Sequence, residues 1–385
     1  MIESKLPAVG TTIFTVMSRL AEEHGAVNLG QGFPDFDPPE PLKVALARHV
    51  ASGKNQYAPM AGVPALRERI AVEVERTYGR RVDPERELTI TSGATEAIFD
   101  AIAAAVGPGD EVIVLDPAYD SYEPAVLLQG ARAVHVPLRS PSFSVDWQRV
   151  ADAITERTRM LVINFPHNPS GAMLAPGELD TLAEILRGTK VLLLSDEVYE
   201  HVVFDGRKHQ SVLRHDELYA RSFAVSSFGK SYHATGWKVG WATAPPALTT
   251  ELRKVHQFVT FSTSTAAQHA LADVLAENPA HSSELGAFYQ AKRDRFRELV
   301  AEVPFTLLPV AGAYFQLADY SAVSTEDDVT FARRLTTEVG VAAIPLSPFY
   351  ETPPAQRVVR FCFCKRDETL VAAAERLRRL VPTRR

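Results

Sequence analysis

The sequence predicts an α/β protein with a mostly parallel sheet in a large domain and a smaller α+β domain. Short apolar runs between residues 112 and 225 alternate with helical patterns or long loops. Such alternation is typical of a parallel sheet that helices cover on both faces. After about residue 284 the pattern changes to short strands with two helices. The chain has 385 residues, enough for two lobes.

The first elements are a helix and two loops. Apolar residues recur at helical spacing over residues 11–24, and Gly25 supplies a stop. Residues 27–39 are rich in Gly and Pro and are expected to form a loop, either a linker or the lining of a pocket between lobes. A second, polar-aromatic loop over residues 55–62 precedes a helix over residues 64–78.

Residues 88–106 are expected to form a strand, a tight turn and a helix. The strand covers residues 88–91, and the helix starts at Thr95 after Ser92-Gly93-Ala94. A helix N-terminus that follows a glycine turn offers free backbone N–H groups and a favourable dipole, so a phosphate could bind there.

The strands of the large sheet are expected at residues 112–115, 133–136, 160–163, 191–194 and 223–225. Residues 239–242 are expected to add a further strand, and helices are expected between the strands, for example over 150–156 and 178–186. Ligands of such sheets bind beyond the carboxyl ends of the strands. The residues found there are Tyr119, Asn168, Asp196 with Tyr199, and Lys230. Each alone has an ordinary explanation in a turn or in packing, but together they predict an active site.

The segment that contains Lys230 and Lys238 consists mainly of small, hydroxylic and aromatic residues. A lysine held among apolar neighbours has a lowered pKa and can attack an aldehyde as a neutral amine. Taken alone, the segment is more typical of a surface turn. A Walker A loop is excluded because Ala224, not glycine, stands five residues before Gly229.

The C-terminal part is expected to form the α+β domain. Residues 248–275 are expected to form one long or two short helices, and a charged helix over 284–300 marks the lobe boundary. Strands are expected at 305–309, 314–318, 341–344 and 358–363, with helices over 327–338 and 368–380. Arg360 lies in the last strand, either at an exposed edge or as a bidentate clamp for a carboxylate.

Composition excludes several classes of function. A net charge of −6 without a basic stretch argues against nucleic-acid binding. No apolar run is long enough to span a bilayer, and no metal-binding motif is present. The N-terminal residues lack a signal-peptide pattern, and Cys362 and Cys364 are too close in one strand to bridge each other. We therefore expect a cytoplasmic protein.

Four motifs show a resemblance over essentially the whole chain. They are Asn168-Pro169-x-Gly171, Asp196-Glu197-Val198-Tyr199, Ser227-Phe228-Gly229-Lys230 and Gly236-Trp237-Lys238-Val239-Gly240. With them the sequence resembles the class I/II aminotransferases of fold type I, which use pyridoxal 5′-phosphate (PLP). Residues 28–36 and 360–363 are similar to the kynurenine aminotransferase branch. Residues 4–15 and 227–237 are most similar to its bacterial methionine aminotransferases.

The resemblance implies a seven-stranded sheet, a large domain over residues 46–284 and a small domain from residues 1–45 and 285–385. It also implies a homodimer with shared active sites. For the cofactor, it implies that Lys230 holds the aldehyde covalently and then moves the substrate Cα proton. Asp196 would pair with the pyridinium, Asn168 and Tyr199 would bond the phenolic oxygen, and Tyr119 would stack on the ring.

The resemblance also implies the ligands of the phosphate and of the substrate. The phosphate would be bound by Ser227, Lys238, the backbone of Ala94 and Thr95, and Tyr57 from the partner subunit. The substrate carboxylate would be bound by Arg360, with Asn168 and the backbone of Gly32. Phe14, Phe33 and the partner subunit's Phe261 would form an apolar pocket for the side chain.

The implied activity is ping-pong transfer of an amino group from methionine, aromatic or other large apolar amino acids to a 2-oxo acid. Thr95 and Ser262 stand where some kynurenine aminotransferases carry tyrosine and histidine, which weakens the case for kynurenine as donor. Two alternatives remain open. One is a kynurenine aminotransferase with cysteine-S-conjugate β-lyase activity; the other is a catalytically silent binding or regulatory protein with this fold.

Overall fold

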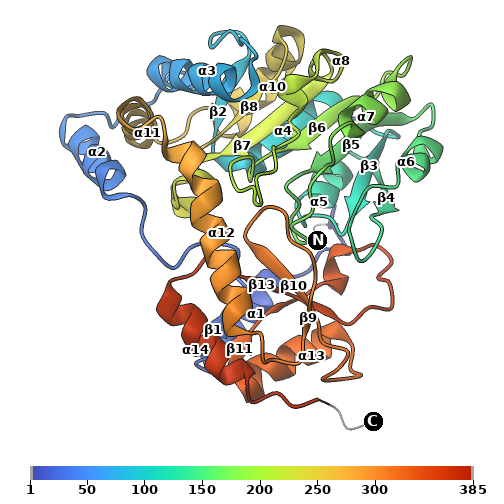
Figure 1. The fold of residues 1–385 in the computed structure, drawn as a ribbon. Helices are drawn as coiled ribbons and strands as arrows, with labels where there is room; N and C mark the ends of the chain where they lie inside the picture. The colour runs from blue at the N-terminus through green and yellow to red at the C-terminus, as the bar shows by residue number, and fades with distance from the viewer. Residues whose placement is uncertain (1–2, 383–385) are drawn as a thin grey trace.

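The computed structural model describes residues 3–382. Met1 and Ile2, part of the stretch that lacks a signal-peptide pattern, lie outside the described residues. The large domain contains the predicted seven-stranded sheet (Figure 1). Its strand order is β2 (Leu88–Thr91), β8 (Gly240–Thr243), β7 (Ser222–Ser227), β6 (Leu192–Asp196), β5 (Thr158–Asn164), β3 (Glu111–Asp116) and β4 (Arg132–Pro137). Only β8 runs antiparallel to its neighbours, so the prediction of a mostly parallel sheet is confirmed.

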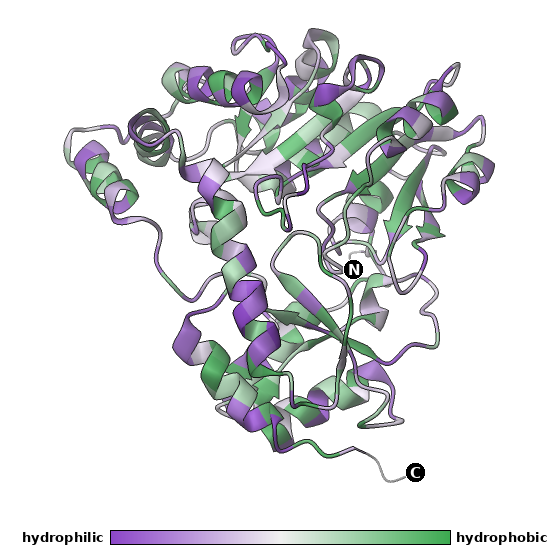
Figure 2. Cartoon of the chain, viewed as in Figure 1, coloured by the Kyte–Doolittle hydropathy of each residue, from purple (hydrophilic) through white to green (hydrophobic). Residues whose placement is uncertain are grey.

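Helices cover both faces of this sheet. In β3, Val112 and Val114 belong to one buried cluster, while Ile113 and Leu115 belong to another, because successive side chains of a strand point to opposite faces. The first cluster includes residues of α4 (Gly93–Ala105), α5 (Tyr122–Leu128) and α10 (Pro246–Val259). The second includes residues of α3 (Pro64–Tyr78), α7 (Glu178–Leu186) and α11 (Thr265–Glu277). Figure 2 shows these strands as apolar ribbons between mixed helices.

The smaller domain is built around a second, antiparallel sheet. Its strand order is β12 (Ile344–Pro345), β13 (Val358–Cys362), β10 (Phe315–Asp319) and β9 (Thr306–Leu307). Helices α1 (Ile13–Glu23), α13 (Asp328–Arg334) and α14 (Asp367–Leu377) lie in the same part of the molecule, and α12 (His281–Leu299) runs along both domains (Figure 1). Chain segments from both ends of the sequence therefore meet in this domain.

Several local expectations differ from the structure. The stretch expected to be an irregular loop begins with a two-residue strand, β1 (Val27–Asn28), which pairs with β11 (Val341–Ala342). The local sequence does not predict β1, because this partner lies far away in the sequence. Of the two alternatives for residues 248–275, the structure shows two helices, α10 and α11, and not one long helix. Helices α2 (Glu40–Ala51) and α5 were not expected. Helix α5 has only 7 residues, and α2 buries only Leu42 and Ala45, so their apolar patterns are weak.

The predicted domain boundaries, at residues 45/46 and 284/285, fall inside α2 and α12. The exact division of the chain therefore stays a prediction. None of the helices within residues 3–382 combines the length and the apolar character that crossing a membrane requires.

Candidate active site

Nearly all of the predicted site residues line one cavity of about 250 Å³. The cavity is bordered by strand ends of the large sheet and by the two ends of the chain, which contribute residues of the smaller domain. The predicted residues that line it are Phe14, Gly32, Phe33, Ala94, Thr95, Tyr119, Asn168, Asp196, Tyr199, Ser227, Lys230, Lys238 and Arg360. The fold thus brings together side chains that are up to 346 positions apart, from Phe14 to Arg360.

Lys230 lies on a single helical turn, α9 (Phe228–Ser231), directly after β7. The Ser227 hydroxyl accepts the Gly229 N–H at 3.2 Å and caps this turn. Lys230 Nζ donates to the Gly32 carbonyl at 3.4 Å. Burial lowers the pKa of Lys230, which favours the neutral, nucleophilic amine.

Asp196 ends β6 at the floor of the cavity and is 4% exposed. Its carboxylate accepts the Tyr122 hydroxyl at 2.6 Å, and its backbone carbonyl accepts Asn164 Nδ2 at 2.9 Å. Burial raises the pKa of Asp196 to about 6, while the charge of Lys230 opposes this rise. The carboxylate would therefore gain from a cationic partner inside the cavity.

Tyr122 and Asn164 are functional candidates that sequence reasoning missed. Asn164 Oδ1 also accepts the backbone N–H of Asn168 at 2.9 Å, so one amide holds both Asp196 and Asn168. The signal was available, because Asn164 directly follows a predicted strand. Tyr122 stands near Tyr119, and the two rings pack edge to face at 5.7 Å.

The N-terminus of α4 forms a cradle together with Lys238. Gly93 has a left-handed backbone (φ +76°), and an added Cβ there would lie 3.1 Å from Lys238 Nζ, so the ammonium lies over the first turn. A Cβ on Gly240 would come within 2.6 Å of the Ala94 nitrogen, which requires glycine at this position. The Thr95 hydroxyl hydrogen-bonds to Tyr119 at the same end of the helix. A cation over a helix N-terminus suits a phosphate.

Arg360 lies in β13, an inner strand of the second sheet, and is 1% exposed, which excludes the exposed-edge interpretation. Its Nη1 donates to Asn168 Oδ1 at 2.8 Å, and its Nη2 donates to the Gly30 carbonyl at 2.7 Å. Its guanidinium lies 4.1 Å from the centre of the Phe315 ring, and within residues 3–382 its Nε has no hydrogen-bond partner. A buried, incompletely paired guanidinium suits a carboxylate ligand.

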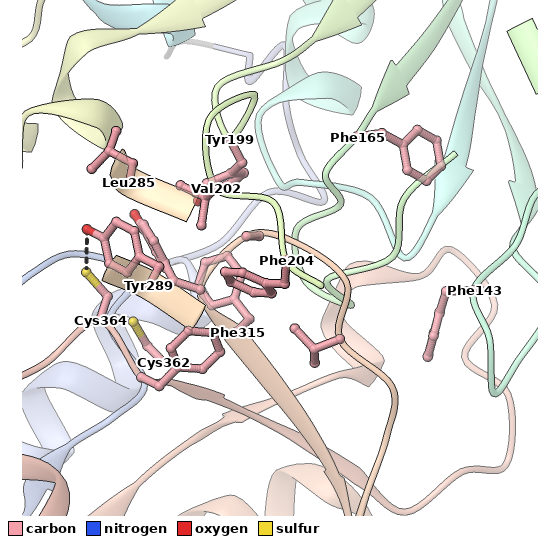
Figure 3. Close-up of a cluster of buried hydrophobic side chains, with 14 of the residues drawn as sticks. Phe143, Phe165, Tyr199, Val202, Phe204, Leu285, Tyr289, Phe315, Cys362 and Cys364 are labelled. Atoms are coloured by element: carbon pink, nitrogen blue, oxygen red, sulfur yellow. Dashed lines mark hydrogen bonds between the residues drawn. The ribbon is translucent and has the colours of Figure 1, made fainter. Parts of the chain in front are cut away.

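An aromatic cluster beneath the cavity connects the two domains. Figure 3 shows Tyr199 and Phe204 of the large domain near Tyr289 of α12 and Phe315 of β10. The Tyr199 ring packs edge to face on Phe315 at 5.8 Å. The Tyr289 hydroxyl contacts Cys364 Sγ at 3.3 Å, the dashed line in Figure 3. Both cysteines are free thiols, as predicted.

Tyr57 and Phe261 are the predicted site residues that do not line the cavity. Their side chains are 84% and 40% exposed, and their rings pack edge to face at 5.6 Å. Phe258, at the end of α10, is 86% exposed. These three aromatic residues contribute to the apolar surface of the subunit near the loops at residues 57–62 and 258–263.

Glu96, Asp100 and His256 bring three buried ligand-type side chains together behind the cradle. His256 Nε2 lies 2.9 Å from the Met60 carbonyl, and its Nδ1 lies 2.9 Å from Glu96 and 3.5 Å from Asp100. Both ring nitrogens therefore face oxygen acceptors, which fits a doubly protonated ring. The two carboxylates raise the pKa of His256 to about 9, against the effect of burial.

Comparison with known proteins agrees with this geometry. The family described as aminotransferase class I and II matches residues 24–377. The chain belongs to the class I and II aminotransferases. It is 53% identical to methionine aminotransferase of Escherichia coli K12 over 98% of both chains. A solved E. coli structure with methionine aminotransferase function matches at a TM-score of 0.97, covering 99% and 100% of the two chains.

Two further relatives have other printed activities. A probable N-succinyldiaminopimelate aminotransferase of Mycobacterium tuberculosis is 41% identical over 98% of both chains. Kynurenine–oxoglutarate transaminase 1 of mouse is 35% identical over 97% of this chain and 96% of its own. The relatives therefore belong to one family, but their printed activities differ in the amino acid on which they act.

Aminotransferases of this family use pyridoxal phosphate, and the cavity fits this cofactor. The α4 cradle with Lys238 suits the phosphate, and Lys230 offers an amine to the aldehyde. The carboxyl group of Asp196, whose pKa burial raises to about 6, suits a pyridinium as a cationic partner. The cavity therefore has a suitable partner for three groups of the cofactor: its phosphate, its aldehyde and its pyridinium nitrogen.

Proposed function

We propose that this aminotransferase takes the amino group from methionine and from aromatic or other large apolar amino acids. Two features support this preference. The chain is 53% identical to the E. coli methionine aminotransferase. In addition, Phe14, Phe33 and Phe315 line the cavity next to Arg360, so a substrate side chain would meet aromatic rings.

The observation that carries the proposal is the meeting of Lys230, Asp196, Asn168 and Arg360 in one cavity. Lys230 would hold the cofactor and carry the proton at the substrate Cα, a role that its lowered pKa suits. Asp196 would pair with the pyridinium nitrogen. The bound cofactor supplies an electron sink for the bonds at Cα.

The other residues would bind and orient. Asn168 and Tyr199 would donate hydrogen bonds to the phenolic oxygen, and Tyr119 would stack on the ring. The phosphate would be bound by Ser227, Lys238 and the backbone of Ala94 and Thr95. Arg360 would hold the substrate carboxylate with both Nη groups, together with Asn168 and the Gly32 backbone.

We also propose that the enzyme is a cytoplasmic homodimer, in which Tyr57 and Phe261 complete the site of the partner subunit. Their exposure and their position outside the cavity of their own subunit support this role. The division into a large domain of residues 46–284 and a small domain from the two chain ends belongs to the same proposal.

A half-reaction screen tests the donor preference. The PLP-loaded enzyme is mixed with single amino acids, and the loss of absorbance of the lysine-bound cofactor is followed without any 2-oxo acid. Methionine, phenylalanine and tyrosine should react faster than alanine and aspartate. Fastest reaction with aspartate would contradict the proposal, and pyruvate release from a cysteine S-conjugate would favour the β-lyase alternative.

A further inference from the structure

The segment 30–33 is bent, and each of its four backbone carbonyl groups accepts a hydrogen bond from the side chain of a residue far away in the sequence. The Gly30 carbonyl accepts Arg360 Nη2 at 2.7 Å. The Gly32 carbonyl accepts the Tyr314 hydroxyl at 2.8 Å and Lys230 Nζ at 3.4 Å. Two of these donors, Arg360 and Lys230, belong to the proposed binding and catalytic groups.

The carbonyl groups of the other two residues, Gln31 and Phe33, both bind one side chain, that of Lys365. Lys365 Nζ donates to the Phe33 carbonyl at 2.7 Å and to the Gln31 carbonyl at 3.2 Å. The same ammonium lies 5.1 Å from the centre of the Phe33 ring. Lys365 is not among the residues that line the cavity.

Lys365 is an unusual residue to find buried. It is 3% exposed, and no carboxylate of residues 3–382 forms an ion pair with it. Burying an ammonium costs free energy, and replacing it by an apolar side chain of similar volume is often neutral or stabilising. Its placement is therefore better explained by the segment it holds than by a contribution to stability.

Phe33 needs such support. Its side chain is 44% exposed although it lines the cavity, so packing alone holds it weakly. When cofactor and substrate engage Lys230 and Arg360, the bonds from these two residues to the Gly32 and Gly30 carbonyl groups compete with those ligands. Lys365 does not line the cavity, so its bonds to Gln31 and Phe33 do not compete.

We propose that Lys365 is a positioning residue that sets the donor specificity by holding Phe33 over the substrate side chain. The inference rests on the proposed function, because it assumes that the side chain of the donor reaches the aromatic wall. A large apolar donor should depend on Lys365, whereas a donor with a single methyl group should not.

The test compares the PLP-loaded wild-type enzyme with Lys365→Met in steady-state assays with methionine, phenylalanine and alanine. For the two large donors, KM should rise roughly tenfold, the lower end of what a change in an apolar pocket costs, with kcat nearly unchanged. For alanine, both constants should stay within about twofold, because its methyl group makes little contact with the pocket. Backbone amide exchange should accelerate in residues 30–33.

Lys292→Met is the matched control. Lys292 Nζ also donates to a backbone carbonyl, that of Lys365, at 2.8 Å and lies 5.2 Å from the Phe36 ring centre, but it makes no hydrogen bond to residues 30–33. This variant should keep the wild-type ratio between large and small donors. If it reproduced the pattern of Lys365→Met, the proposal would be wrong.

A double-mutant cycle with Phe33→Ala tests the route of action. If Lys365 acts through Phe33, adding Lys365→Met to Phe33→Ala should change the methionine-to-alanine ratio little further. Additive losses, or equal losses for all three donors, would overturn the proposal. Lys365→Gln serves for the same measurements if the methionine variant does not fold.

Failure of the proposed function is a separate outcome. It would appear in the wild-type enzyme as the absence of a preference for methionine and phenylalanine over alanine. Even then, unchanged amide exchange of residues 30–33 in Lys365→Met would overturn the positioning role, and accelerated exchange confined to that segment would support it.

Discussion

Lys230 and Lys238 lie in the same segment after β7, but their surroundings give the two ammonium groups different chemistry. Lys230 is partly buried beside Tyr199 and Tyr314, and burial lowers its pKa, which favours the neutral amine. Lys238 is exposed, and its Nζ lies over Gly93 at the start of α4. The first lysine therefore suits covalent and proton chemistry, and the second suits anion binding.

The two lysines should respond differently to substitution. Lys230→Ala should lower kcat by roughly 10³-fold or more, because both the covalent attachment and the proton carrier are lost. Saturating PLP should not restore turnover. Lys238→Met should weaken PLP binding but recover most of its kcat at high PLP. Titration of activity against PLP measures both effects, and full recovery of Lys230→Ala would refute its role.

At the scale of elements, helix α4 connects the phosphate cradle to α10 and to the loop that carries Tyr57. The Glu96 carboxylate accepts the Ser92 N–H just before the helix and is bound by His256 of α10. The other nitrogen of His256 faces Met60, in the loop that carries Tyr57. One buried imidazole thus joins the cradle to an element that we propose faces the partner subunit.

This cluster predicts a pH dependence of stability. The pKa of His256 rises from 6.5 to about 9 in the folded protein, a difference on the order of 3 kcal/mol. Because the raised pKa belongs to a base, this stabilisation is fully present below pH 6.5 and is lost as pH rises through about 9. Urea unfolding of wild type and His256→Gln between pH 6.5 and 10 measures it.

The difference in free energy of unfolding between the two proteins should be largest at the acidic end and should shrink toward pH 10. Arg253 provides a control on the same helix, since its guanidinium binds Thr89 and the Leu88 carbonyl and does not contact the cluster. A difference independent of pH for His256→Gln would show that the ring is neutral in the folded protein.

At the scale of the whole molecule, the cavity of one subunit is lined by residues from both ends of the chain, whereas Tyr57 and Phe261 remain on the surface. A tyrosine that is 84% exposed, such as Tyr57, makes little contribution to the fold of its own subunit. In a two-fold dimer with shared active sites, Tyr57 would face the partner subunit, which would explain its exposure in the single subunit.

Complementation between inactive subunits tests this arrangement. Lys230→Ala and Tyr57→Ala subunits are unfolded, mixed in equal amounts and refolded together at limiting PLP. If Tyr57 serves the partner's site, each mixed dimer has one intact site, and about a quarter of wild-type activity should return. If Tyr57 served its own subunit, every site would carry one defect and no activity would return.

The sequence alone determined the fold class and most of the chemistry, because both depend on local patterns. Alternating apolar runs predicted the sheet, and the residues after each strand gave Tyr119, Asn168, Asp196 and Lys230, all of which line the cavity. Parallel strands end at one edge, so residues that follow them must lie close together. The lysine segment, ambiguous alone, became informative through these partners.

Only the tertiary structure decided what depends on contacts between distant segments. Strand β1 forms because Val341–Ala342 lies beside it, and Arg360 is buried because β13 lies inside its sheet. Tyr122, Asn164 and Lys365 act through hydrogen bonds to other elements. Such bonds depend on how elements that are remote in the sequence pack together. This packing produces no periodic pattern of residues in the sequence, so it could not be predicted. The local pattern therefore identified the chemical groups, and packing decided which partner holds each of them.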